Sequence, residues 1–158
     1  SGIGKKPSVR SNKAITNTIR RCFASYEVKA NYRRGTSYVR FAPAFAEKLG
    51  LDWESTNDTA RVVYCLQTGG VVVVHVGGRR EGFPGLFSRS GHYVVAISQE
   101  RDGRIAILDP AYRPGRYDIE GCEGYVTMKN EVIALCDLDI LAKDASNRDP
   151  SFYLFWRK

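Results

Sequence analysis

The sequence is poor in the residues that build metal centres. Its 158 residues include only two histidines and four cysteines. No two cysteines form a C-x-x-C pair, and two histidines are too few for the ligand spacing of a zinc finger. The glycines of residues 77–85 form neither a GxxxxGK loop nor a GxGxxG motif after a strand, which argues against nucleotide binding. We therefore expect neither a metal nor a cofactor.

The chain also lacks a long apolar run. The longest, at residues 71–76, is interrupted by His75 and falls far short of the ~20 residues that a membrane helix needs. The first residues, SGIGKKP, contain lysines without a following apolar stretch, so they do not form a secretory signal. We expect a domain without a membrane span, and any signal would lie upstream of residue 1.

Positive charge is in excess, but it is scattered. The 24 basic residues outnumber the 17 acidic ones, which gives a formal net charge of +7. They fall in isolated pairs without interleaved aromatic residues, and no nucleic-acid-binding motif surrounds them, so no nucleic-acid partner is expected. The same charge would attract the chain to an anionic membrane or cell wall.

Helical periodicity dominates the first seventy residues. Apolar residues recur every three or four positions over residues 14–30, which predicts an amphipathic helix. A second helix is expected over residues 43–49, opened by a proline and followed by a glycine. A third begins near Ser55 or Thr56, with Asp58 in its first turn.

From residue 71 onward, β-branched runs replace the helical pattern. Asp102-Gly103 is a strong signal for a tight turn between two strands. The last segment, which is aromatic, is expected to close the sheet. Helices followed by an antiparallel sheet predict one α+β domain over residues 1–158. The expected strands are residues 71–76, 93–97, 105–108, Val126 with 132–135, and 152–156.

Two cysteines flank the hairpin expected in the last third of the chain. A two-residue turn at Lys129-Asn130 would place Cys122 opposite Asp137, diagonal to Cys136. A disulfide between these cysteines would need a bulge. The sequence therefore leaves their pairing undecided.

Two polar side chains end neighbouring strands of the expected sheet. His92 opens a strand after a loop that we expect to be exposed, and Asp109 closes the next strand. A turn at Asp102-Gly103 would place Asp109 opposite residue 96, so contact with His92 requires a bulge or an offset turn. A carboxylate in contact would fix the tautomer of the imidazole and stabilise its charged form. Without contact, a strand-end histidine and a turn-forming Asp-Pro are ordinary structural features.

Other candidate nucleophiles and bases have weaker patterns. His75 lies inside an apolar strand, where we expect it to be a hydrogen-bonded partner in the sheet. Ser88 and Ser90 lie close to His92 in sequence, but no G-x-S-x-G elbow surrounds them, which argues against a serine hydrolase.

Four segments resemble, in their order and spacing, a known family. They are LQTGGVVV at residues 66–73, the glycine-rich loop ending at Phe87, GHYVV at residues 91–95 and IAILDP at residues 105–110. Together they resemble the double-glycine-leader (bacteriocin-processing) peptidase branch of the bacterial papain-like cysteine peptidases. Residues 24–51 are similar to the helical part of secreted clostridial members.

The resemblance implies a papain-like cysteine peptidase fold and a Cys/His/Asp site. In such a site His92 is the general base and acid for a thiol at a helix N-terminus, and Asp109 orients His92. A helix N-terminus and an imidazolium both favour the reactive thiolate. The implied substrate is a peptide or protein, and the implied location is extracellular or at the cell surface.

The chain departs from the family's pattern at the nucleophile. The family's helix with Gln before Cys-Gly should precede residues 14–30, and residues 1–13 contain neither Gln nor Cys. Cys22 is the default replacement, but the middle of a helix offers neither a helix terminus nor an open approach. Three interpretations remain: a peptidase whose nucleophile lies upstream of residue 1, a non-catalytic pseudo-peptidase that binds peptides, and a transglutaminase-like acyl transferase.

Overall fold

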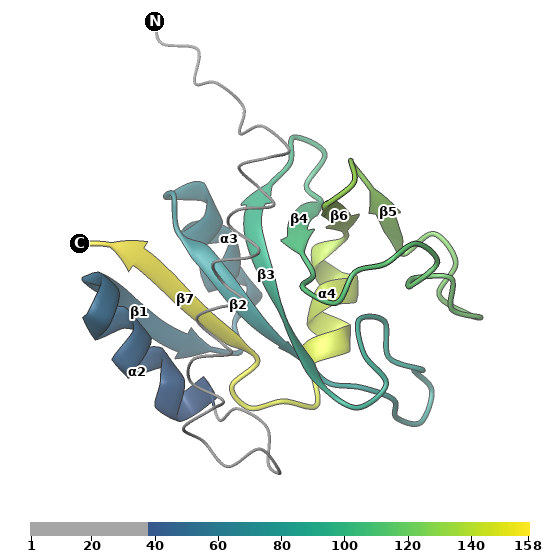
Figure 1. Ribbon diagram of the computed structural model, residues 1–158, viewed down its shortest axis with the longest axis horizontal. Coiled ribbons are helices and arrows are strands. Elements are labelled where there is room, and N and C mark those ends of the chain that lie inside the picture. The colour runs from purple at the N-terminus through teal and green to yellow at the C-terminus, as the bar shows by residue number, and fades with distance from the viewer. Residues whose placement is uncertain (1–37) are drawn as a thin grey trace, which may run out of the picture. The chain divides into compact units, whose positions relative to one another are not determined.

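Seven antiparallel strands and three helices make up the part of the chain that the computed structural model describes, residues 38–158 (Figure 1). The strands form one sheet in the order β1-β7-β2-β3-β4-β6-β5. The α+β class with an antiparallel sheet is confirmed. The elements are α2 (Tyr38–Leu49), β1 (Leu51–Thr56), α3 (Thr59–Gln67), β2 (Val71–Val76), β3 (His92–Gln99), β4 (Ile105–Leu108), β5 (Val126–Met128), β6 (Ile133–Cys136), α4 (Leu138–Ala145) and β7 (Phe152–Arg157).

The helices cover opposite faces of the sheet. Neighbouring side chains on a strand point to opposite faces. On β7, the ring of Phe155 packs edge-on against Phe45 of α2, with ring centroids 5.4 Å apart. The next residue, Trp156, donates its indole N–H to the hydroxyl of Thr68, just past α3, at 3.2 Å. The residues of α3 and α4 share one apolar core, so these helices lie on the face opposite α2.

The main core lies between the sheet and the helices α3 and α4. It also takes in three side chains of the long loop between β2 and β3 and one from the segment before β5. The expectation that this loop is exposed is therefore wrong for these side chains, which are part of the packed interior. Its largest fully buried side chains include Phe87, Leu86, Ile105, Ile107, Leu141, Phe152 and Leu154.

The helix predictions need correction at three places. The second helix begins at Tyr38, so Pro43 lies inside it. Proline removes one backbone hydrogen bond there, while Phe41, Ala42 and Ala46 are buried on its apolar face. The third helix begins at Thr59, and Asp58 is its N-cap, accepting from the amide of Ala60 at 2.8 Å.

Two elements were not predicted, β1 and α4. The strand β1 has no β-branched run, and it is defined by its pairing with β7, from Leu51 opposite Arg157 to Thr56 opposite Phe152. The helix α4 has only eight residues and follows β6 almost directly, so its periodic signal is short. The helix predicted over residues 14–30 lies outside the described residues.

The strand predictions fare better. Residues 71–76 and 105–108 are strands with the predicted bounds. The aromatic segment forms a strand as predicted, β7, which lies between β1 and β2 within the sheet. Within residues 38–158, no helix is long and apolar enough to cross a membrane.

The predicted turn of the last hairpin is wrong. Val126 faces Cys136 and Met128 faces Ala134, so the turn lies after residue 129. Asn130 stabilises this turn, because its side chain accepts the amides of residues 132 and 133. Cys122 therefore precedes the hairpin, and both Cys122 and Cys136 are buried free thiols.

Candidate functional site

The turn between β3 and β4 is offset by one residue from the predicted turn. The amide of Glu100 donates to the carbonyl of Arg104 at 2.8 Å, and the amide of Gly103 donates back to Glu100 at 3.0 Å. Residue 100, rather than residue 101, thus lies opposite residue 104. Gly103 has a φ of 89°, a conformation that glycine adopts without strain.

A β-bulge just before Ser98 shifts the register a second time. Extending the register beyond the bulge by one residue places Asp109 beside Val94, where simple pairing placed it beside Ala96. His92 lies two positions from Val94 on the same face of the sheet. The sequence indicated that contact between His92 and Asp109 requires a bulge or an offset turn, and the structure contains both.

His92 and Asp109 are in direct contact. The Nε2 atom of His92 lies 2.8 Å from Oδ1 of Asp109. The Asp109 side chain is fully buried, whereas that of His92 is 23% exposed. Because an ionised carboxylate can only accept, Nε2 carries a proton, and in the neutral imidazole Nδ1 has the lone pair. The imidazole is thus held in the tautomer whose Nδ1 can take a proton from a reacting group.

Three further donors surround the carboxylate of Asp109. The amide of Ala111 donates to Oδ1 at 2.8 Å, while Arg116 Nε and the hydroxyl of Tyr117 donate to Oδ2 at 2.8 and 2.9 Å. Burial alone would raise the pKa of Asp109, but the hydrogen bonds from His92 and Ala111 and the charge of Arg116 outweigh it and lower this pKa. Burial also raises the pKa of Tyr117, so its hydroxyl stays protonated as a donor.

Arg116 and Tyr117 are members of the site that the sequence analysis missed. Successive turns fold the chain back toward Asp109: the amide of Tyr112 donates to the carbonyl of Asp109, and that of Arg116 to the carbonyl of Arg113, each at 3.0 Å. The run DPAYRPGRYD, with Asp-Pro and Pro-Gly, was the available signal for such turns.

The loop before His92 is anchored by a second buried carboxylate, on α4. Asp144 accepts the amides of Leu86 and Phe87 at 2.9 and 3.1 Å. Burial raises the pKa of Asp144, although these hydrogen bonds partly offset the effect. Arg80 of the same loop donates to the carbonyls of Lys143 and Asp144 near the end of α4. These contacts fix the loop against α4.

The segment after α4 holds the two ends of this loop together. Arg148 Nη2 donates to the carbonyl of Gly77 at 3.0 Å and to that of Ser90 at 2.9 Å. Ser88 Oγ accepts the amides of Ser90 and Gly91 at 3.1 and 2.9 Å, so this serine stabilises a turn. The residues that lead into His92 are therefore fixed from both sides.

Arg116 joins the loop to the carboxylate of Asp109. Its Nη2 donates to the carbonyl of Phe87 at 2.5 Å, while its Nε binds Asp109. The ring of Phe87 packs edge-on against Tyr117, with centroids 5.5 Å apart. The His92 site is thus continuous with the apolar core.

No cysteine of residues 38–158 has the character of a nucleophile. Cys65, Cys122 and Cys136 are buried. Burial raises the pKa of Cys65 to about 11 and that of Cys136 to about 12, which disfavours the thiolate. Cys22 lies outside the described residues.

The contacts of His75, the second histidine, indicate a structural role. The backbone amide of His75 donates to Ser151 at 2.9 Å, and its ring stacks on Tyr93 with centroids 4.3 Å apart. Burial, with the charge of Arg148 adding to it, lowers the pKa of His75 to about 4. This ring is therefore neutral at physiological pH.

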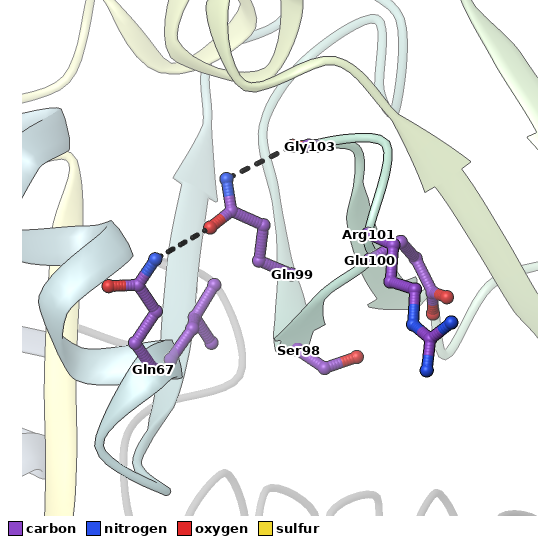
Figure 2. Close-up of a pocket in the computed structure, with 7 residues that line it drawn as sticks. Gln67, Ser98, Gln99, Glu100, Arg101 and Gly103 are labelled. Carbon is purple, nitrogen blue, oxygen red and sulfur yellow. Dashed lines mark hydrogen bonds between the residues drawn. The ribbon is translucent and has the colours of Figure 1, made fainter.

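A polar pocket lies at the other end of β3, between the end of α3 and the β3-β4 turn (Figure 2). Gln67 donates to Gln99 at 3.2 Å, and Gln99 donates to the carbonyl of Gly103 at 3.3 Å. Because β3 runs between them, this pocket lies about 20 Å from His92. The part of the chain described holds no cluster of three or more His, Cys, Asp or Glu side chains suited to a metal.

No protein-family model, curated protein or solved structure matches this chain.

Proposed function

We propose that this chain is the papain-like domain of a cysteine peptidase, in which His92 is the general base and acid and Asp109 orients it. The hydrogen bond between His92 Nε2 and Asp109 Oδ1, at 2.8 Å, carries the proposal. It leaves Nδ1 as the basic nitrogen on a ring that is partly exposed at the start of a strand. Papain-like chemistry needs this arrangement, and the sequence motifs resemble that family.

In the proposed reaction, His92 Nδ1 takes the thiol proton and the thiolate sulfur attacks the carbonyl carbon of the peptide bond. Collapse of the tetrahedral intermediate breaks the C–N bond, and Nδ1–H gives its proton to the leaving amine. Water then attacks the thioester with His92 as base, which releases the acid and restores the thiol. The thiol would come from a segment outside residues 38–158.

A non-catalytic peptide-binding module is the second candidate. The buried character of Cys65, Cys122 and Cys136 favours it, because a histidine and an aspartate without a thiol cannot form a thioester. A transglutaminase-like acyl transferase would use the same His92 and Asp109, with an amine in place of water as the second acceptor.

An active-site label tests the proposal directly. The natural full-length protein is treated with a peptide carrying a thiol-reactive warhead, and the labelled cysteine is identified by mass spectrometry. One cysteine should react fastest, and His92→Ala should slow its labelling while the control His75→Gln leaves it unchanged. Labelling that is uniform over all cysteines, or unaffected by His92→Ala, would favour the binding module.

The same label distinguishes the sources of the thiol. Modification of Cys22 would identify this residue as the nucleophile, and modification of a cysteine upstream of residue 1 would identify the helix that the family resemblance implies. Reading the gene upstream of residue 1 for a Gln followed by Cys-Gly gives an independent answer.

An extracellular or cell-surface location is proposed from the family resemblance, and attraction to anionic surfaces from the net charge of +7. Sedimentation with anionic vesicles tests the second point. Binding that is strong at low salt and lost at high salt is expected, whereas equal binding to neutral vesicles would contradict it.

A further inference from the structure

We propose that Arg116 is a positioning residue that neutralises Asp109, so that the carboxylate orients the His92 ring without holding a full negative charge against it. The consequence for catalysis rests on the proposed function, but the contacts and the test do not. The site would then consist of four hydrogen-bonded side chains, those of His92, Asp109, Arg116 and Tyr117, rather than a histidine and a carboxylate alone.

The hydrogen bonds of Asp109 divide evenly between its two oxygens. Oδ1 accepts from His92 and from the amide of Ala111, and Oδ2 accepts from Arg116 and Tyr117. A carboxylate has about four acceptor positions, so all of them are used. The carboxylate therefore cannot rotate without losing bonds, and the direction of His92 Nε2–H is fixed.

Arg116 partly offsets the charge of Asp109, because its guanidinium binds Oδ2 while His92 binds Oδ1. Arg116 Nε lies 2.8 Å from Oδ2, with the Asp109 side chain fully buried and that of Arg116 20% exposed. Water screens such a pair poorly, so each charge acts strongly on the neighbouring imidazole. The imidazole lies beside a pair whose formal charge is zero.

Arg116 is held in place from its other end. Its Nη2 donates to the carbonyl of Phe87, and Asp144 in turn accepts the amide of Phe87. Two separate nitrogens of one guanidinium thus bind two different acceptors, which a lysine ammonium could not do with the same geometry. The cation is fixed beside Asp109 and cannot leave for solvent without breaking both contacts.

When variants at Arg116 are compared, the other charged groups near His92 stay the same. Arg148 lies beside Gly91 and binds the carbonyl of Ser90. Asp144, on α4, accepts the amide of Leu86 in the loop before His92. His75, on the adjacent β2, is neutral because burial lowers its pKa to about 4. Changes at Arg116 therefore report on the Asp109 pair.

For a peptidase that works near neutral pH, this arrangement has a clear value. A general base works best when its proton affinity suits the working pH, since it must both take and return a proton. An unpaired buried carboxylate would hold the proton on His92 and make the ring a poorer base. Arg116 limits that effect while Asp109 still orients the ring.

The test is an NMR titration of the His92 imidazole in the 158-residue chain. The chain has only two histidines, so His75→Gln assigns the signals. Arg116→Gln should raise the titration midpoint of His92, because it removes a cation and exposes the charge of Asp109. Arg116→Lys, which keeps the charge, and Tyr117→Phe, which removes one hydrogen bond and no charge, should shift it much less.

A double-variant cycle separates the charge effect of Arg116 from other effects of its replacement. Asp109→Asn should lower the midpoint, because Arg116 is then unpaired, and Asp109→Asn/Arg116→Gln should return it toward the original value. If Arg116→Gln leaves the midpoint unchanged in a folded protein, or if the double variant matches Asp109→Asn, the proposal is overturned. These readouts do not depend on peptidase activity, so a negative result in active-site labelling leaves them intact.

Discussion

Gly91 passes so close to Arg148 that a Cβ at residue 91 would lie 2.6 Å from Arg148 Nη2. That nitrogen also holds the carbonyls of Gly77 and Ser90, and Gly91 itself has a φ of 149°. The backbone conformation therefore favours glycine before His92, and a Cβ there would also displace the end of the Arg148 side chain from its two hydrogen bonds. The backbone at the start of β3 is therefore held in one conformation, which fixes the position of His92.

Gly91→Ala should accordingly destabilise the fold by about 2 kcal/mol or more, from backbone strain together with the clash at Arg148. Gly82→Ala is the matched control, because Gly82 also has a positive φ, of 72°, but nothing lies within 4 Å of its missing Cβ. Urea unfolding of the two variants measures the difference. Equal losses would show that the contact with Arg148 is unimportant.

Asp109 should make the stability of the fold depend on acid. Its pKa in the fold is lower than its ordinary value, so its ionised form stabilises the folded state above that ordinary value, about pH 4, and the stabilisation is lost as the pH falls through the lower value. The free energy of unfolding should thus fall more steeply below about pH 4 in the original protein than in Asp109→Asn.

Denaturant unfolding at several pH values between neutrality and pH 3 gives these slopes. Asp52→Asn is a useful control, because Asp52 is exposed on β1, far along the sheet order from β3 and β4. Parallel slopes for the original protein and Asp109→Asn would contradict the ionised, hydrogen-bonded state of Asp109.

The packing of α4, an element that the sequence did not reveal, can be measured through Leu141. This side chain is fully buried in the core, so Leu141→Ala should cost about 2–5 kcal/mol. Leu49→Ala should cost far less, because Leu49 is 53% exposed at the end of α2. Thermal or urea unfolding measures the loss of stability in each variant. Similar losses at the two positions would place α4 outside the core.

The sequence predicted local features well and long-range features poorly. The strands Val71–Val76 and Ile105–Leu108 are β-branched runs bounded by turn residues, and their bounds agree with the structure. The strand β1 could not be found this way, because its partner β7 lies about a hundred residues further along the chain. Its formation is decided by tertiary pairing rather than by local propensity.

The candidate site shows the same division. The residue types at His92 and Asp109 were visible in the sequence, but their contact depends on an offset turn and a bulge that no local pattern fixes. Arg116 reaches Asp109 only after two turns, and its role depends on the carbonyl of Phe87 in another loop. Partners that arrive through loops are the part of a site that sequence patterns describe least.

Peptide hydrolysis by the natural full-length protein tests the central claim most directly. A mixed peptide library is digested and the products are identified by mass spectrometry, with His92→Gln and His75→Gln compared at equal concentrations of folded protein. Amide cleavage is expected, with kcat/KM lowered by at least about 1,000-fold in His92→Gln and little changed in His75→Gln. Cleavage by His92→Gln at the rate of the original protein, or no cleavage by the original protein, would contradict the assignment of His92 as the general base of a cysteine peptidase.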